Sequence, residues 1–209
     1  MRRFLIADDH AIVRMGLKHI LLQAFPSTVI EEVTNTNDLL EKVTREEWDL
    51  VISDISMPDR SSLEVLHQIR LDHPKLPILI VSIHSEDQYA IRVLRAGASG
   101  YLSKESAATE LARAVDQLLL GKKYITTSIA EKMANMLDTD MVKLPHENLS
   151  DREFQVCKLL AAGQSVSEIA KSIFLSVSTV STYRSRVMSK LNVRTNSDLI
   201  LYAIENKLL

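Results

Sequence analysis

The sequence predicts a doubly wound α/β domain with a five-stranded parallel sheet, followed by a small all-α domain of four helices. Short runs rich in Val, Ile and Leu alternate five times with longer segments whose apolar residues recur at helical spacing. Such alternation favours parallel strands, because each crossover between them has room for a helix. From about residue 148 only helical patterns remain, and 209 residues suit two modest domains.

Five strands and five helices are expected in residues 1–121. The strands fall at 3–8, 29–33, 49–54, 77–82 and 99–103. The helices fall at about 10–25, 36–47, 62–72, 85–96 and 106–120. Side chains suited to N-caps mark three helix starts, at Thr36 or Asn37, at Ser85 and at Ser106. Gly97 and Gly121 stand where helices should end.

Residues 122–147 are expected to form a linker that holds one helix, and residues 148–209 a compact four-helix domain. The linker helix runs from Ile129 to Leu137, before a polar stretch that contains a proline. Two capping boxes, Ser150 to Glu153 and Ser165 to Glu168, start the first two helices of the tail. A third helix is expected at 177–191 behind Ser176, and a fourth at 197–207 behind Asn196.

Composition indicates a cytoplasmic protein without a membrane segment. Apolar residues make up 46% and charged residues 25%, and no apolar run approaches the roughly 20 residues that span a bilayer. The first apolar run is too short for a signal peptide, and the single cysteine cannot form an internal disulfide. Residues 1–122 carry 14 basic against 18 acidic side chains, and residues 148–209 carry 8 against 5, which weakly favours a polyanionic partner for the tail.

Four ionisable side chains follow the ends of three predicted strands. Asp8 and Asp9 follow the first strand, Asp54 ends the third and Lys104 follows the fifth. The carboxyl ends of parallel strands meet at one edge of the sheet, so these groups should converge. A carboxylate can accept a phosphoryl group, and Asp54 is the candidate. Asp8 or Asp9 with Asp54 would hold Mg²⁺, and Lys104 would stabilise negative charge.

These motifs resemble those of a known family. Asp8-Asp9, Asp54 with Met57-Pro58, Ser82 and Tyr101-Leu-Ser-Lys104 resemble a two-component receiver domain, which has a flavodoxin-like fold. The tail resembles a LuxR-type helix-turn-helix from Leu149-Ser-Asp-Arg-Glu153 to Lys190-Leu-Asn192. Together they resemble a response regulator of the NarL/FixJ family over essentially the whole chain. The resemblance implies a DNA-binding transcription regulator rather than an enzyme.

The resemblance also implies roles for residues of the receiver. Asp54 would be phosphorylated by a sensor histidine kinase or a phosphotransfer protein. The backbone carbonyl of Ser56 would join Asp8, Asp9 and Asp54 at the magnesium ion. Ser82 would bond the new phosphoryl group, and Tyr101 would follow it between outward and inward rotamers. Read from residue type alone, the Ser could equally cap a turn and the Tyr could pack half-buried.

Helix 177–191 is the candidate recognition helix for double-stranded promoter or operator DNA. Its candidate DNA contacts are Ser178, Thr179, Ser181, Thr182, Arg184, Ser185, Arg186 and Lys190. Family members commonly carry basic residues where this chain has Ser181 and Ser185, so hydroxyls would replace them here. A homodimer is expected, with Leu199, Tyr202 and Ala203 of the last helix as its contact surface, although core packing explains these three equally well.

Two positions in the acceptor loop depart from the family pattern, and they leave alternatives open. Ser62 stands where glycine is usual, and Asp59 stands where glycine is often found. Because glycine reaches a positive φ at little cost, these replacements predict slower phosphorylation of Asp54. One alternative is a DNA-binding regulator that acts without phosphorylation. Another is an aspartyl-phosphate phosphotransferase, but the short connections between the β-α units leave no room for the substrate cap that such an enzyme needs. His10 and His84 are interpreted as surface or packing residues, and Trp48 and Cys157 as core.

Overall fold

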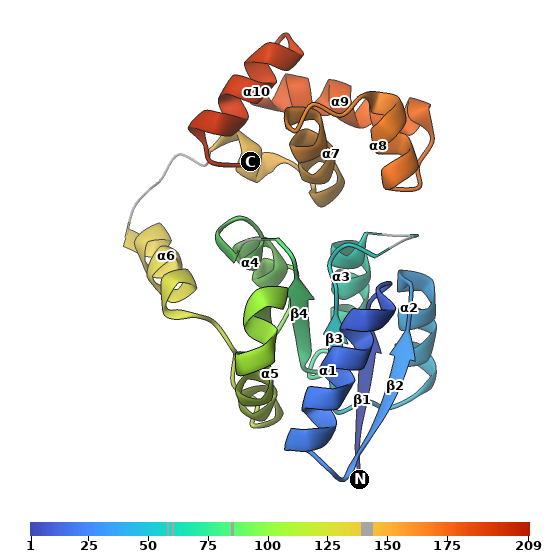
Figure 1. The fold of residues 1–209 in the computed structure, drawn as a ribbon. Coiled ribbons are helices and arrows are strands. Elements are labelled where there is room, and N and C mark those ends of the chain that lie inside the picture. The colour runs from blue at the N-terminus through green and yellow to red at the C-terminus, as the bar shows by residue number, and fades with distance from the viewer. Residues whose placement is uncertain (58, 60, 85, 139–143) are drawn as a thin grey trace. The chain divides into compact units, whose positions relative to one another are not determined.

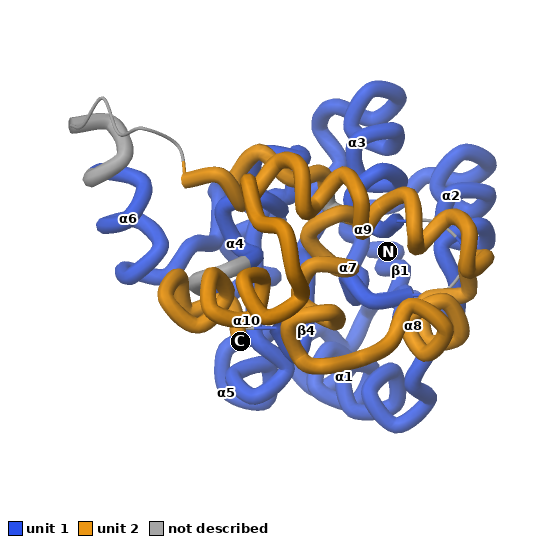
Figure 2. Tube along the Cα trace, turned by 90° about the horizontal axis from the view of Figure 1, so that it is seen from above, with its two compact units in different colours: residues 1–139 blue, residues 140–209 orange. Residues whose placement is uncertain are grey.

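The structure is a computed structural model that describes residues 1–57, 59, 61–84, 86–138 and 144–209. It divides into two compact units, residues 1–139 and residues 140–209, which Figure 2 colours separately. No helix in the described ranges is long and apolar enough to cross a membrane.

The first unit is a five-stranded, all-parallel sheet covered by helices on both faces, which confirms the predicted fold class (Figure 1). The strands are β1 (Arg2–Ala7), β2 (Thr28–Val33), β3 (Leu50–Ser53), β4 (Ile78–Ser82) and β5 (Gly100–Ser103), in the order β2-β1-β3-β4-β5. The helices are α1 (Ala11–Ala24), α2 (Thr36–Arg45), α3 (Ser62–Asp72), α4 (Glu86–Arg95), α5 (Lys104–Leu119) and α6 (Thr127–Asp138).

The central strands are buried on both faces, as expected for a parallel sheet. Every residue of β3 and β4 is buried. Helices α1 and α5 pack together over one face of the sheet, where Leu21 and Leu111 join Phe4 and Ile52 in a continuous apolar core. Trp48 is buried, as predicted. This core fixes the strand ends at which the polar groups lie.

Two predicted helix starts in the first unit are wrong. The N-cap of α2 is Asn35, whose side chain accepts a hydrogen bond from the Asp38 N–H at 2.8 Å, rather than Thr36 or Asn37. The N-cap of α5 is Ser103, whose hydroxyl accepts from the Ser106 N–H at 3.1 Å. In both cases the capping side chain lies three residues before the donor, at the last extended residue. The predicted N-cap Ser85 lies outside the described residues.

The segment after α5 packs onto the first unit, although we expected a linker from residue 122. Tyr124 forms a parallel bridge with Gly100, and its N–H donates to the Ser99 carbonyl at 2.9 Å. The Thr126 hydroxyl donates to Glu86 at 2.8 Å, and α6 contacts α4. Tyr124 and Ile129 are buried. The predicted linker helix therefore exists, but it belongs to the first compact unit; residues 139–143 of the expected linker lie outside the described residues.

The second unit contains the four predicted helices. A short 3-10 helix (Pro145–Asn148) precedes α7 (Asp151–Ala161), α8 (Val166–Ser172), α9 (Val177–Leu191) and α10 (Asn196–Glu205). Both predicted capping boxes are present, at Ser150 and at Ser165. The last helix begins behind Thr195 rather than Asn196, because Thr195 forms a third capping box with Asp198. Cys157 is buried in this core, as predicted.

Candidate functional site

Three of the four predicted ionisable groups meet at the carboxyl edge of the sheet. Lys104 Nζ lies 2.7 Å from Asp8 Oδ2 and 2.8 Å from Asp54 Oδ2. Asp8 follows β1, Asp54 follows β3 and Lys104 follows β5, so the parallel sheet brings together residues 96 positions apart in the chain. Both carboxylates are buried. The result is a small site with two buried negative charges and one ammonium.

Burial and charge act against each other at Asp54. Burial raises the pKa of this carboxyl above its ordinary value and repulsion by Asp8 adds to the rise, while Lys104 opposes it. Asp54 Oδ1 accepts the backbone N–H of Ile55 at 2.6 Å. Burial alone would lower the pKa of Lys104, but the two carboxylates outweigh it and raise the pKa. The ammonium therefore keeps its charge between Asp8 and Asp54.

The acidic residues also satisfy the donor set of a hard cation. One ligand atom each of Asp8, Asp9, His10 and Asp54 lies within 4.8 Å of all the others. Carboxylate oxygens are the ligands that Mg²⁺ takes in proteins, so the three aspartates fit it. His10 was interpreted as a surface or packing residue; it is exposed, but its Nδ1 lies 2.7 Å from Asp9 Oδ1. Its position next to Asp9 in the sequence is the feature from which this contact could have been predicted.

The predicted switch residues lie beside this pocket and share a partner in His84. Ser82 and Tyr101 are fully buried. The Tyr101 hydroxyl donates to the His84 carbonyl at 2.7 Å, and the His84 N–H donates to Ser82 Oγ at 3.3 Å. The His84 ring stacks on Tyr89 at 4.4 Å, and its Nε2 lies 3.1 Å from Ser56 Oγ. Sequence reasoning missed this role of His84, which is half-buried.

The two departures in the acceptor loop have different structural consequences. Asp59 adopts a positive φ of 77°, a conformation that glycine reaches without strain. Its carboxylate accepts a hydrogen bond from the Asn37 amide at 3.1 Å. Ser62 is the first residue of α3 and is not among the residues with positive φ. Among the described residues of this loop, Asp59 therefore has the left-handed backbone, and position 62 does not require glycine.

The candidate recognition helix α9 presents hydroxyls rather than basic groups at most of its predicted DNA contacts. Ser178, Ser181, Thr182, Ser185 and Arg186 are exposed. Ser178, Thr179, Thr182, Tyr183 and Arg186 line a shallow hollow of about 290 Å³.

Two of the predicted basic contacts are bonded within their own domain. Arg184 Nη2 donates to Asn196 Oδ1 at 2.9 Å, and Lys190 Nζ lies 2.6 Å from Glu153 Oε2. The ammonium of Lys190 also donates to the Asn148 carbonyl at 3.2 Å. Both basic groups are therefore held by intramolecular partners, and Arg186 is the exposed arginine of the predicted set.

The predicted dimer surface is wrong for Leu199 and Ala203. Both are fully buried, because this side of α10 packs against α7 within the domain. Tyr202 is half-buried, and its hydroxyl accepts the His146 N–H at 3.2 Å. The same helix exposes Leu201 and Ile204 instead.

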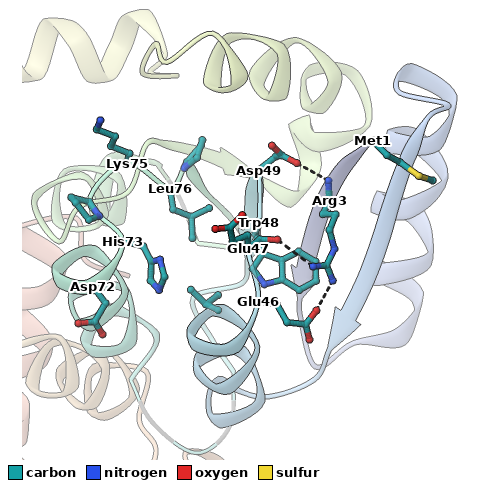
Figure 3. A pocket seen from close by; sticks show the side chains of 13 residues that line it. Met1, Arg3, Glu46, Glu47, Trp48, Asp49, Asp72, His73, Lys75 and Leu76 are labelled. Carbon is teal, nitrogen blue, oxygen red and sulfur yellow. Dashed lines mark hydrogen bonds and ion pairs between the residues drawn. The ribbon is translucent and has the colours of Figure 1, made fainter.

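A larger hollow of about 660 Å³ lies at the opposite, amino-terminal edge of the sheet (Figure 3). Arg3 lines this hollow, and its backbone N–H donates to Asp49 at 2.8 Å. Its guanidinium pairs with Glu46 and lies 4.4 Å from the centre of the Trp48 ring. These bonds satisfy Arg3 within the fold. Met1, Asp49 and Pro77 of its lining directly precede β1, β3 and β4, so the hollow is separate from the acidic pocket at the strands' carboxyl ends.

Comparison with known proteins matches both units. Residues 4–116 match the response regulator receiver domain, and residues 147–203 match the bacterial regulatory proteins of the luxR family. The chain is 34% identical to the response regulator UvrY of Escherichia coli strain K12, covering 100% of this chain and 96% of UvrY. It is also 34% identical to the oxygen regulatory protein NreC of Staphylococcus epidermidis strain ATCC 35984, covering 99% of each chain.

Among solved structures, the chain is similar to RcsB of Salmonella enterica serovar Typhimurium. That protein was solved bound to the promoter rprA in the presence of the phosphomimetic BeF3−. The TM-score is 0.65 at 27% sequence identity, and the match covers 97% of this chain and 98% of RcsB.

Proposed function

The chain belongs to the response regulators that join a receiver domain to a LuxR-type DNA-binding domain, and we propose that phosphorylation of Asp54 switches its binding to promoter DNA. The observation that carries the proposal is the buried cluster in which Lys104 bridges Asp8 and Asp54. A buried carboxylate beside a fixed ammonium is prepared to accept a group that brings further negative charge. A sensor histidine kinase or a phosphotransfer protein would supply that group.

In the proposed reaction, an Asp54 carboxylate oxygen attacks phosphorus and forms an acyl phosphate. The bond from phosphorus to the donor nitrogen breaks, and the donor imidazole keeps that electron pair. Asp8, Asp9 and Asp54 with the Ser56 carbonyl would hold Mg²⁺, which when bound neutralises charge on the phosphoryl oxygens. The Lys104 ammonium would also neutralise charge on the phosphoryl group, because its Nζ already lies 2.8 Å from Asp54 Oδ2.

The signal would leave the pocket through Ser82 and Tyr101. A phosphoryl group on Asp54 offers strong acceptor oxygens to the buried Ser82 hydroxyl. Movement of Ser82 would disturb the bond it accepts from the His84 N–H, and His84 in turn holds the Tyr101 hydroxyl. The two arrangements of these side chains form the two-state element that phosphorylation biases.

We further propose that α9 enters the major groove and that the protein binds as a homodimer. Helix-turn-helix dimers read two half-sites about one helical turn apart. The exposed Leu201 and Ile204 on α10 replace the predicted Leu199 and Ala203 as the dimer surface, because both are large apolar side chains exposed three residues apart on one helix. RcsB was solved bound to promoter DNA, which supports the binding of this chain to promoter DNA.

The first test is the intact mass of the protein after incubation with Mg²⁺ and acetyl phosphate, run beside Asp54→Asn. One added phosphoryl group on the parent and none on the variant supports the proposal. The strained Asp59 favours a second candidate, a regulator that binds DNA without this phosphorylation. An unlabelled parent that still binds a specific DNA sequence, with a control receiver labelled in parallel, would select that second candidate.

A further inference from the structure

Two exposed apolar side chains stand at the start of the recognition helix. Val177 is the first residue of α9 and is 51% exposed. Phe174, in the turn between α8 and α9, is 72% exposed. The side chains that follow along the outer side of α9 are hydroxyls, at Ser178, Ser181 and Thr182. The amino-terminal end of α9 is therefore apolar, whereas the exposed positions that follow carry hydroxyls.

Phe174 combines exposure with an unfavourable backbone. Its φ is 56°, at the position after the C-cap of α8, where glycine is the usual residue. The turn is otherwise regular, since the Leu175 N–H donates to the Ala170 carbonyl at 2.9 Å. A bulky residue in this conformation is strained, and strained backbone of this kind is concentrated at functional sites.

We propose that Val177 and Phe174 contact the C5-methyl groups of thymines in the major groove. This rests on the proposed DNA binding. The amino-terminal residues of a recognition helix face the base edges, and the thymine methyl is the apolar group displayed there. An apolar pair at this end therefore fits thymines, and Val177 lies four residues before the exposed Ser181 on the same helix.

The remaining chemistry of α9 is consistent with this readout. Serines occupy positions 181 and 185, and Arg184 is bonded to Asn196, so few positive groups on this helix can pair with guanine. Hydroxyls bond any base, whereas a methyl contact separates thymine from cytosine. The apolar pair then carries a substantial part of the sequence discrimination.

The test starts from a DNA sequence selected from a random duplex pool by the full-length protein treated with Mg²⁺ and acetyl phosphate. Each thymine of the selected half-site is then replaced by deoxyuridine, which removes the methyl and leaves the base pairing intact. We expect one or two positions per half-site at which affinity falls about fourfold, the effect of losing one buried methyl-sized group.

Variants assign each sensitive position to a side chain. Val177→Ala and Phe174→Gly should each abolish the loss at one deoxyuridine position, so that thymine and deoxyuridine duplexes bind equally. Phe174→Gly also removes the strain at a positive φ, so its thermal midpoint should not fall. Leu209→Ala, an exposed apolar residue of the same domain, is the matched control and should keep the full thymine preference.

Several results would overturn the inference. If a selected half-site contains no thymine, or if both variants keep the parental preference for thymine, the two side chains do not read methyl groups. If Phe174→Gly instead raises the DNA affinity of the unphosphorylated protein, the aromatic ring serves an inhibitory contact. If no sequence is enriched from the pool, the proposed DNA binding itself fails, and the inference falls with it.

Discussion

Replacing Lys190 by Met should lower the stability of the C-terminal domain. The Glu153 side chain is 4% exposed, and its Oε2 lies 2.6 Å from Lys190 Nζ. The same carboxylate accepts the Ser150 N–H at 2.7 Å and so starts α7. Met keeps the apolar stem of Lys190 but removes the ammonium, and the buried carboxylate then loses its charged donor.

The expected loss is about 0.8–1.5 kcal/mol. A hydrogen bond to a charged group contributes about 1.5–3 kcal/mol, and solvent screening removes about half of this because the Lys190 side chain is 41% exposed. For a domain of this size, the loss corresponds to a fall of about 3–12 °C in the unfolding midpoint.

The effect should depend on pH. Burial alone would raise the pKa of Glu153, but Lys190 and Ser150 outweigh it, and the pKa lies below its ordinary value of 4.5. A carboxyl with a depressed pKa in the folded state stabilises the fold above its unfolded pKa, and this stabilisation is lost as the pH falls through the folded value. The difference between parent and Lys190→Met should therefore be complete at neutral pH and shrink below about pH 4.5.

Thermal unfolding followed by far-ultraviolet circular dichroism measures this difference in the full-length chain. Trp48 is the single tryptophan and lies in the first unit, so its fluorescence transition is an internal control and should not move. An unchanged dichroism midpoint at neutral pH, or the same difference at pH 3 as at neutral pH, would refute the assignment of Lys190 to a structural ion pair.

Three further substitutions test separate features. Asp59→Gly should stabilise the first unit by about 0.3 kcal/mol, because about 1–2 kcal/mol of left-handed strain is relieved against about 0.4–1 kcal/mol of added chain entropy and about 0.5 kcal/mol for the lost hydrogen bond from Asn37. Urea denaturation measures the change, and a loss of more than about 0.5 kcal/mol would contradict it. Gly100→Ala should destabilise the same unit by about 1–3 kcal/mol, because its Cβ would lie 2.9 Å from Tyr124. Gly16→Ala, with open space around its Cβ, is the matched control and should not be destabilising. Leu201→Asp should weaken dimerisation of the phosphorylated protein about tenfold in analytical ultracentrifugation while its thermal midpoint stays unchanged, and an unaltered dimer would exclude this face of α10.

The sequence predicts the sheet and the acidic pocket because both follow from order along the chain. Alternating strand and helix patterns fix a parallel sheet, and a parallel sheet places Asp8, Asp54 and Lys104 at one edge without any knowledge of distances. Capping boxes are equally local, and those at Ser150 and Ser165 are present as predicted.

The remaining features depend on which neighbour covers a side chain, which a linear pattern does not contain. The apolar stripe of α10 suits a dimer or a core, and the structure assigns Leu199 and Ala203 to the core. Lys190 reads as a DNA contact until Glu153, 37 residues earlier, is found beside it. The sequence around His84 does not show its role, because its partner Ser56 lies in the loop after β3 and its partner Tyr101 lies in β5.

The most direct test of the central claim is the affinity of one selected DNA duplex for the parent and for Asp54→Asn, both treated with Mg²⁺ and acetyl phosphate. Treatment should raise the affinity of the parent at least about tenfold, a coupling of about 1.4 kcal/mol, and should leave the affinity of the variant unchanged. Equal affinities for the treated and untreated parent, with the phosphoryl group present on Asp54, would contradict the switch.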